Sequence, residues 1–321
     1  MSVCHDLFID FHSEIFLTSD KKESLRTSRN AVREKIKKHF RDKLKLEEPK
    51  FYGQGSYMMN TTVVPIDGEF DIDDGIYLQN LEGVEEKDWP IPTTVHNWIL
   101  DAVNGHTSSS PVDKNTCVRV IYKANYHVDL PIYVMSGSHP KLAHKSKGWI
   151  DSDPKELTKW FNGEATSKGA QLKRIVRYLK AWKDYKEGET KLPSGMILSI
   201  LAINHFVSDY KDNDDKALVE TVRAIKEALD TSFSLVRPVF PSEELINDWS
   251  ETKKTNFLDK LDSLIKKGDE ALTSSDKTSA SKKWRGIFGD RFPEYQAPDS
   301  ETSAAFRSTS PAILGNHGRS A

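Results

Sequence analysis

Two carboxylates separated by one residue, Asp71 and Asp73, are the clearest candidates for chemistry in this 321-residue sequence. On a β-strand alternate side chains share a face, so both carboxylates would lie side by side while Phe70 and Ile72 point into a core. Adjacent carboxylates repel each other unless a proton or cation lies between them. No basic residue stands within two positions of the pair. Oxygen ligands suit magnesium or manganese, so the pair predicts a divalent-metal site.

A Gly-Gln-Gly-Ser segment, residues 53–56, precedes this acidic pair. Glycine lets the backbone approach a phosphate closely, and the exposed N–H groups of such a turn bind anions. By itself, Asp-x-Asp is more often an acidic strand end that runs into a turn, because surface carboxylates are common. A phosphate-binding turn shortly before a metal-binding pair instead favours nucleotidyl transfer.

A third carboxylate, Asp129, falls in a segment that predicts another strand. Residues 127–135, HVDLPIYVM, alternate so that Asp129 and His127 share the face that points away from the core. A lone aspartate is usually a cap or one half of an ion pair. In a sheet that already carries Asp71 and Asp73, however, a third coplanar carboxylate is what a two-metal site needs.

Residues 53–75, GQGSYMMNTTVVPIDGEFDIDDG, resemble the active-site signature of the cGAS/DncV-like nucleotidyltransferases, and in particular the branch of bacterial cyclic GMP-AMP synthases. The shared pattern is Gly-Ser, a Thr a few residues on, and then Asp-x-Asp. The resemblance implies an α+β fold: a polymerase-β-like core with a mixed sheet and helices, followed by a helical C-terminal half. It covers about residues 20–293. It is strongest at 51–78, 127–135, 146–162 and 170–196.

The resemblance also implies roles for single residues. The family's third metal-binding Asp sits in a His-x-Asp-x-Pro motif, which matches HVDLP and therefore Asp129. Arg119, on an expected strand over residues 117–122, matches an arginine near the nucleotide, and a surface salt bridge is the alternative. Ser194, at the start of an apolar helix, matches a serine that contacts a nucleobase in the family, and an N-cap is the alternative. The nucleotide contacts implied are Gln54, Gly55, Ser56, Tyr57, Met59, Arg119, Lys180, Ser194 and Asp290.

The assignment of Lys180 rests on a helix expected over residues 168–185. Its buried stripe would be Leu172, Ile175, Val176, Leu179 and Trp182. Lys173, Arg177 and Lys180 follow at helical spacing and form a basic ridge beside that stripe. A charge run is usually a solvated face. The resemblance instead implies that the Lys-x-Trp element reaches the donor triphosphate, with Lys180 the first candidate.

Composition narrows the class of protein. Lys and Arg number 46 against 48 Asp and Glu, whereas binding of long nucleic acids usually goes with a basic excess. The two cysteines, Cys4 and Cys117, have no metal-like spacing and indicate a reducing compartment. The acidic N-terminal segment is unlike a signal peptide, and no apolar run has the length of a membrane span. We therefore expect a cytoplasmic protein that has no contact with membranes.

The expected domains are a catalytic core with N-terminal helices (1–150), a helical domain that completes the pocket (151–296) and a flexible tail (297–321). Further expectations are a capping box at Asp20 and Glu23 and a polar, loop-rich stretch over 136–167, in which a helix starts at Ser152-Asp-Pro. Helices are also expected at 1–18, 21–45, 93–103, 216–229, 254–272 and 274–287. By resemblance, the tail is where a ubiquitin-transfer-like partner would conjugate the chain through Ala321; an end without a role is the alternative.

The function expected from these features is a Mg²⁺-dependent synthase that joins ribonucleoside triphosphates, ATP and GTP and possibly others, into a cyclic di- or trinucleotide, with cyclic GMP-AMP as the first product to consider. Two Mg²⁺ ions, with Mn²⁺ as a substitute, would bind Asp71, Asp73 and Asp129. By resemblance, the product is a second messenger that activates an effector in CBASS antiphage defence. The alternatives are a nucleotidyltransferase that acts on RNA or protein and a non-catalytic nucleotide-binding protein.

Overall fold

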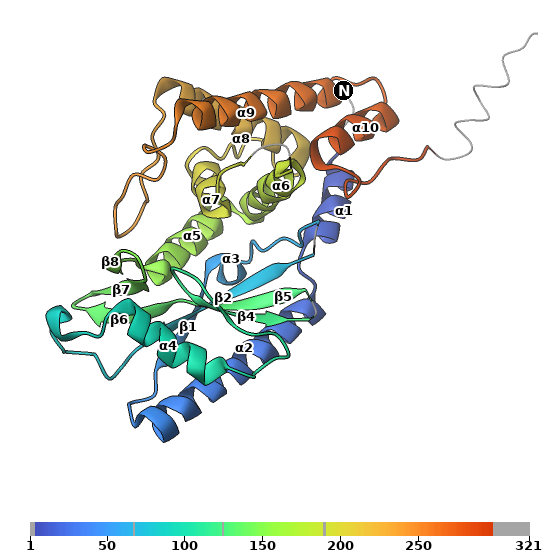
Figure 1. The fold of residues 1–321 in the computed structure, drawn as a ribbon. Helices are drawn as coiled ribbons and strands as arrows, with labels where there is room; N and C mark the ends of the chain where they lie inside the picture. Colours follow the sequence, from blue (N-terminus) through green and yellow to red (C-terminus); the bar gives the residue numbers. More distant parts are fainter. Residues whose placement is uncertain (1–3, 67, 124, 189–190, 298–321) are drawn as a thin grey trace, which may run out of the picture.

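A computed structural model of the chain describes residues 4–66, 68–123, 125–188 and 191–297 (Figure 1). A sheet flanked by helices forms one half, and a stack of helices forms the other. The first half contains α2 (Ser19–His39), η1 (Phe40–Leu44), β1 (Lys50–Gln54), α3 (Gly55–Met58), β2 (Phe70–Tyr77), η2 (Glu86–Asp88), α4 (Pro92–Val103), β3 (Val112–Asp113), β4 (Val118–Tyr122), β5 (Tyr126–Leu130), β6 (Ile132–Ser136), β7 (His139–His144) and β8 (Gly148–Asp151). The helical half contains α1 (His5–Ile15), α5 (Pro154–Lys168), α6 (Ala170–Lys186), α7 (Gly195–Asn204), α8 (Asp214–Thr231), α9 (Glu251–Leu272) and α10 (Lys277–Phe288).

The sheet is mixed, and its strand order places the acidic strands next to each other. The order is β3-β4-β5-β2-β6-β7-β8, and β1 pairs antiparallel with β2. β5 and β6 both run parallel to β2, with Asp73 opposite Asp129 and Ile76 opposite Ile132. The strand predicted at 127–135 is therefore present but is divided at Pro131, because proline has no N–H to donate to a ladder.

Apolar residues of α2 and α4 pack on the sheet and form one core. Leu25 and Ile36 of α2 and Ile99 of α4 are fully buried with Ile72 of β2 and Val128 of β5. This packing holds the acidic strands rigidly from below, in the view of Figure 1. Burial of each such side chain contributes about 1.5–3 kcal/mol.

The start of α2 differs from the expected capping box. The helix begins at Ser19, and the hydroxyl of Thr18 accepts a hydrogen bond from the backbone N–H of Lys21 at 3.4 Å. Asp20 therefore lies inside the first turn, where its charge favours the positive end of the helix dipole. Glu23 instead accepts a hydrogen bond from Arg26. The prediction of a capping box was wrong because the helix starts before Asp20.

The segment between the sheet centre and α5 also differs from expectation. Residues 136–167 were predicted to be polar and loop-rich, with a helix that starts at Ser152-Asp-Pro. That helix is present as α5, capped by Asp153, but the residues before it form β7 and β8 instead of loops. The two strands pair with each other, and β7 extends the sheet from β6. They are short and mostly polar, with Leu142 and Ala143 buried, so their hydrophobic alternation is too weak to predict a strand.

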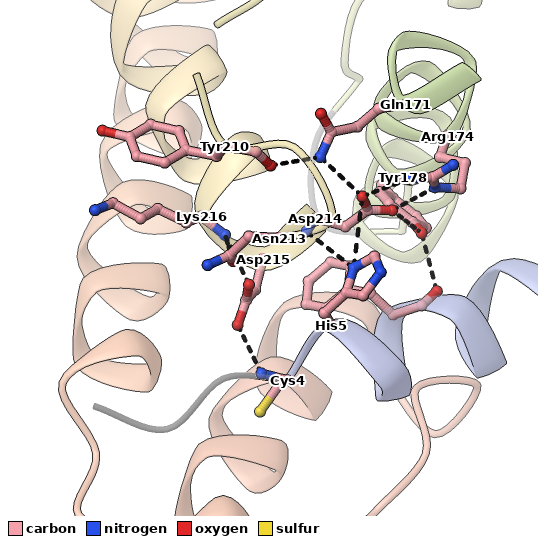
Figure 2. A network of polar contacts seen from close by, with 11 residues as sticks. Cys4, His5, Gln171, Arg174, Tyr178, Tyr210, Asn213, Asp214, Asp215 and Lys216 are labelled. Carbon is pink, nitrogen blue, oxygen red and sulfur yellow. Dashed lines mark hydrogen bonds and ion pairs between the residues drawn. The ribbon is translucent and has the colours of Figure 1, made fainter. Parts of the chain in front are cut away.

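The helical half has its own core, and α1 from the beginning of the chain belongs to it. Phe8 packs edge-on against Tyr178 and Trp284, and Phe11 contacts Phe288. A polar network around Asp214 and Asp215, at the start of α8, connects α1 with α6 and α8 (Figure 2). Among the described helices, none has the length and apolar character needed to cross a membrane. The predicted conjugation site at Ala321 lies outside the described residues.

Candidate active site

Three carboxylates lie together on one face of the sheet, as the sequence predicted. Asp71 and Asp73 are on β2, and Asp129 on the neighbouring β5 lies directly opposite Asp73. Burial, together with the negative charges of Asp71 and Asp129, raises the pKa of the Asp73 carboxyl well above its usual range. A cation at this position would relieve the repulsion, so the group fits a metal ion by its charge and by its oxygen donors.

His127 is a fourth member of this face, and it had been given no role in the sequence analysis. Its ligand nitrogen and the ligand oxygens of Asp71 and Asp129 all lie within 4.8 Å of one another. The residue is 7% exposed, and its Nε2 has no hydrogen-bond partner in the described part of the chain. A buried nitrogen without a partner beside two carboxylates supports a cation site. The signal was present in the sequence, because His127 lies two residues before Asp129.

Arg119 occupies the other side of Asp129. Its Nε and Nη2 each donate to one oxygen of the carboxylate at 2.7 Å, and Lys114 Nζ lies 4.0 Å away. Arg119 and Asp129 are opposite each other in the β4–β5 hairpin. The pair is partly buried, at 20% and 10% side-chain exposure, so it belongs to the site rather than to an open surface. Arg119 therefore supplies part of the counter-charge that the carboxylates need in this state.

The predicted phosphate-binding turn is one turn of helix, α3, directly after β1. Gly55 has φ +67°, and a Cβ at this position would collide with the carboxylate of Asp73. The turn can approach the acidic strand because the residue is glycine. Ser56 Oγ shares a hydrogen bond of 2.8 Å with Thr62 Oγ1, and the Gln54 amide donates to Tyr133 Oη at 3.1 Å.

A cavity of about 600 Å³ lies between the sheet and the helical half. This volume is in the range typical of small-molecule sites. The predicted residues that line it are Gln54, Gly55, Ser56, Met59, Asp71, Asp73 and Lys180. Further residues from α5, α6, α7 and the loop after α8 also line the cavity, among them Trp160, Phe161, Lys183, Ser199 and Arg237. Lys183 belongs to the Lys-Ala-Trp-Lys segment that was expected near the triphosphate, although the sequence did not decide which lysine reaches furthest. The other four were not predicted, because they meet through tertiary packing.

Lys180 points from α6 toward the turn that follows α3. Its Nζ donates to the backbone oxygen of Thr61 at 3.2 Å and to Thr61 Oγ1 at 2.9 Å. Burial lowers its pKa to about 8, and the negative charge of Asp71 opposes this shift. The aliphatic chain of Lys180 packs against Gly195, where a Cβ would come within 3.1 Å of it. The basic ridge expected on α6 is thus partly buried, since Arg177 is 4% exposed.

Four predicted nucleotide contacts are not part of the cavity lining: Arg119, which is paired with Asp129, and Tyr57, Ser194 and Asp290. The Tyr57 hydroxyl donates to the backbone oxygen of Lys22 at 3.4 Å. The Ser194 hydroxyl caps α7 by accepting from Ile197 N at 3.3 Å, although its neighbour Gly195 lines the cavity. Asp290 pairs with Arg285, and its side chain is 96% exposed.

The fold and the site together define a nucleotidyltransferase: a mixed sheet presents three carboxylates beside a Gly-Ser turn, and a helical half closes the cavity. Sequence profiles agree with this class. The profile for the nucleotidyltransferase domain of DncV-like cyclic GMP-AMP synthases matches residues 49–133, and the profile for the C-terminal domain of cyclic GMP-AMP synthase matches residues 169–298. The chain belongs to the DncV-like nucleotidyltransferase family.

Single relatives extend this comparison. A cyclic GMP-AMP synthase from Escherichia albertii is 32% identical over 202 residues, which are 59% of this chain and 44% of the relative. The crystal structure of DncV cyclic AMP-GMP synthase from Vibrio cholerae superimposes with a TM-score of 0.78 at 19% identity, over 91% of this chain and 98% of that one. The same enzyme in complex with the linear intermediate 5′ pppA(3′,5′)pG gives a TM-score of 0.75 at 20% identity, over 91% and 97%. The matched regions span about half the length of the first two relatives, 44% and 58%.

Proposed function

We propose that this chain joins ribonucleoside triphosphates into a cyclic oligonucleotide and releases pyrophosphate, with cyclic GMP-AMP as the first product to test. The observation that carries the proposal is that Asp71, Asp73 and the Gly55–Ser56 turn line a nucleotide-sized cavity, with Asp129 opposite Asp73 on the neighbouring strand. Family membership supports it, because the relatives are cyclic GMP-AMP synthases. A structure of the Vibrio cholerae enzyme contains a linear pppA(3′,5′)pG intermediate, and another contains a non-hydrolysable GTP.

Asp71, Asp73 and Asp129 would hold two Mg²⁺ ions, with Mn²⁺ as a substitute. When bound, such ions lower the pKa of an attacking ribose hydroxyl and neutralise charge on the triphosphate and the departing pyrophosphate. The three carboxylates would fix the positions of the two ions, because the strands that carry them, β2 and β5, are packed against α2. For Asp129 to contribute both oxygens, the Arg119 side chain must loosen its two hydrogen bonds, which frees a guanidinium for a phosphate.

The remaining residues of the site bind and orient. The N–H groups of the α3 turn and the hydroxyl of Ser56 would contact the phosphates of the donor, since they face the cavity next to Asp73. Lys180 would add a positive charge on the opposite wall. Met59, Trp160 and Phe161 give the cavity apolar surface, which holds bases and excludes water. A second reaction in the same cavity, with the linear product turned round, would close the ring.

Larger roles follow from the same proposal. A cyclic dinucleotide made this way would act as a second messenger on an effector in CBASS antiphage defence. The tail, residues 297–321, would be the point at which a conjugating partner attaches the chain to its targets. Both roles rest on family resemblance.

The test uses the purified chain with Mg²⁺ or Mn²⁺ and all four ribonucleoside triphosphates, each α-labelled in turn. Products are treated with phosphatase, separated and weighed, with Asp71→Ala/Asp73→Ala as the control. A phosphatase-resistant product that is absent from the control supports cyclisation, and its mass identifies the bases. Label transferred to added RNA or to a protein would instead establish the alternative nucleotidyltransferase.

A further inference from the structure

His127 is a polar side chain that is buried without a hydrogen-bond partner for one of its ring nitrogens among the described residues. It lies on β5 opposite Asp71 of β2, two residues before Asp129, and its side chain is on the same face as both carboxylates. It is 7% exposed, and its Nε2 has no hydrogen-bond partner among the described residues. A buried polar atom without a partner costs about 1–3 kcal/mol, so native proteins rarely retain one without a ligand or a function.

The spacing around His127 fits a shared ion better than a direct hydrogen bond. No hydrogen bond or ion pair joins His127 to Asp71 or Asp129 in the described chain, yet the three ligand atoms lie within 4.8 Å of one another. Two ligands on opposite sides of a Mg²⁺-sized ion are about 4 Å apart, because each is about 2.1 Å from the ion. A small contraction would therefore place one ion in contact with all three side chains.

The positive neighbours of this group strengthen the case for His127. Arg119 takes both oxygens of Asp129, and Lys114 lies 4.0 Å from the same carboxylate. The counter-charge is thus concentrated at Asp129, on the β4 side. Asp71 and the imidazole of His127 have no such basic partner at hydrogen-bond distance among the described residues, so an entering cation would meet them first.

We infer that His127 supplies a nitrogen ligand to the metal site that it shares with Asp71 and Asp129. This inference rests on the proposed function for the existence of the metal site, and it adds one ligand and a metal preference. An imidazole nitrogen binds transition-metal ions more readily than it binds Mg²⁺, whose preferred ligands are oxygens. The site should therefore favour Mn²⁺ over Mg²⁺ more strongly than an all-carboxylate site would.

The test measures Mn²⁺ on the full chain without nucleotide. Pulsed electron paramagnetic resonance should detect a ¹⁴N coupling to bound Mn²⁺, which becomes a ¹⁵N coupling after histidine-specific ¹⁵N labelling. His127→Gln should lose the coupling and weaken Mn²⁺ binding at least about tenfold. The matched control is His205→Gln, which changes a partly exposed histidine at the end of α7 and should leave both readouts unchanged.

A second variant keeps the result interpretable if His127→Gln folds poorly. His127→Asp replaces the nitrogen by an oxygen ligand, so it should bind Mn²⁺ without the nitrogen coupling and reduce the preference for Mn²⁺ over Mg²⁺. Wild-type protein that binds Mn²⁺ without a histidine coupling would overturn the inference and leave the synthase proposal intact. A histidine coupling in a protein that transfers label to RNA or to a protein and forms no cyclic product would refute the synthase proposal and leave the ligand in place.

Discussion

Two groups of carboxylates in this chain, one in the helical half and one on the sheet, have opposite surroundings. At the start of α8, Asp214 is fully buried, and its oxygens accept hydrogen bonds from Arg174, Gln171 and Tyr178 (Figure 2). At the sheet, Asp73 is half-buried beside the further carboxylates Asp71 and Asp129 and lines the cavity. Asp214 has hydrogen-bond donors and a counter-charge in direct contact, whereas Asp73 has two further acids as neighbours.

The pKa values of the two groups shift in opposite directions. Burial opposes ionisation of Asp214, but the hydrogen bond and charge of Arg174 outweigh it and lower the pKa of this carboxyl. At Asp73, burial and the neighbouring acids act together and raise the pKa. A buried acid with its counter-charge in place connects helices, whereas one that lacks part of its counter-charge marks a ligand site.

The largest effect should follow from removing the charge of Asp73. Asp73→Asn keeps the shape of the side chain and removes its repulsion with Asp71 and Asp129. We expect product formation to fall more than about a thousandfold. In the absence of metal, the melting temperature should stay the same or rise by a few degrees, because a repulsion has been removed.

The measurement pairs the cyclisation assay with thermal unfolding in a chelator. Asp74→Asn is the control, because Asp74 lies on the same strand but is fully buried in an ion pair with Arg33. That variant should lose stability, since it leaves a charged partner unpaired. A lower melting temperature for Asp73→Asn would contradict the contrast between the two groups of carboxylates.

The second prediction concerns Asp214, whose substitution should lower the stability of the fold. Asp214→Asn leaves Arg174 partly buried without its anion, and we expect a loss of about 3–5 kcal/mol in the free energy of unfolding. The lowered pKa of Asp214 means that the wild-type contribution is present above the ordinary carboxyl range near pH 4 and is lost as pH falls through the folded-state pKa. Urea unfolding at pH 7 and at pH 3 measures both parts.

The variant should show a smaller loss of stability than the wild type between these pH values. Its activity per folded molecule should remain within about twofold of the wild type at low temperature, because the network lies in the helical core rather than at the cavity. A large loss of activity at full folding would show that α8 couples to the site.

Substitution of Lys180 should have an intermediate effect on kcat/KM. Burial lowers its pKa to about 8, so the amine loses its charge as pH rises through that value. If the ammonium contacts the triphosphate, kcat/KM should fall above pH 8, and Lys180→Met should reduce it by about 10–100-fold at pH 7. Lys180→Arg keeps its charge at high pH and should remove the decline. A wild-type profile that stays flat to pH 9.5 would exclude this role.

The sequence was sufficient to predict the acidic face, because strand alternation places Asp71, Asp73 and Asp129 together once the strands pair. For Arg119 it left open a nucleotide contact or a surface salt bridge, and it did not identify Asp129 as the partner, which the register of the β4–β5 pairing shows.

Other features of the fold and the site could not be predicted from the sequence, because they depend on tertiary packing. The direction of Lys180 is set by Thr61 and Gly195, which lie far from it in sequence. The strands β7 and β8 are too short and polar for a periodic signal, and the cavity wall from α5 and α7 forms only when the two halves meet.

The smallest effect on activity is expected at Asp290, where the role implied by the family resemblance differs most from the position in the structure. Asp290 was expected to contact the nucleotide, yet its side chain is 96% exposed and pairs with Arg285 outside the cavity lining. Exposed ion pairs contribute little to stability. Asp290→Ala should therefore change kcat/KM for each triphosphate by less than about twofold, measured alongside Ser199→Ala as a cavity-lining comparison. A selective rise in KM for one purine in Asp290→Ala would mean that the segment after α10 moves over the cavity when nucleotide binds, since the present position of Asp290 gives it no route to a base.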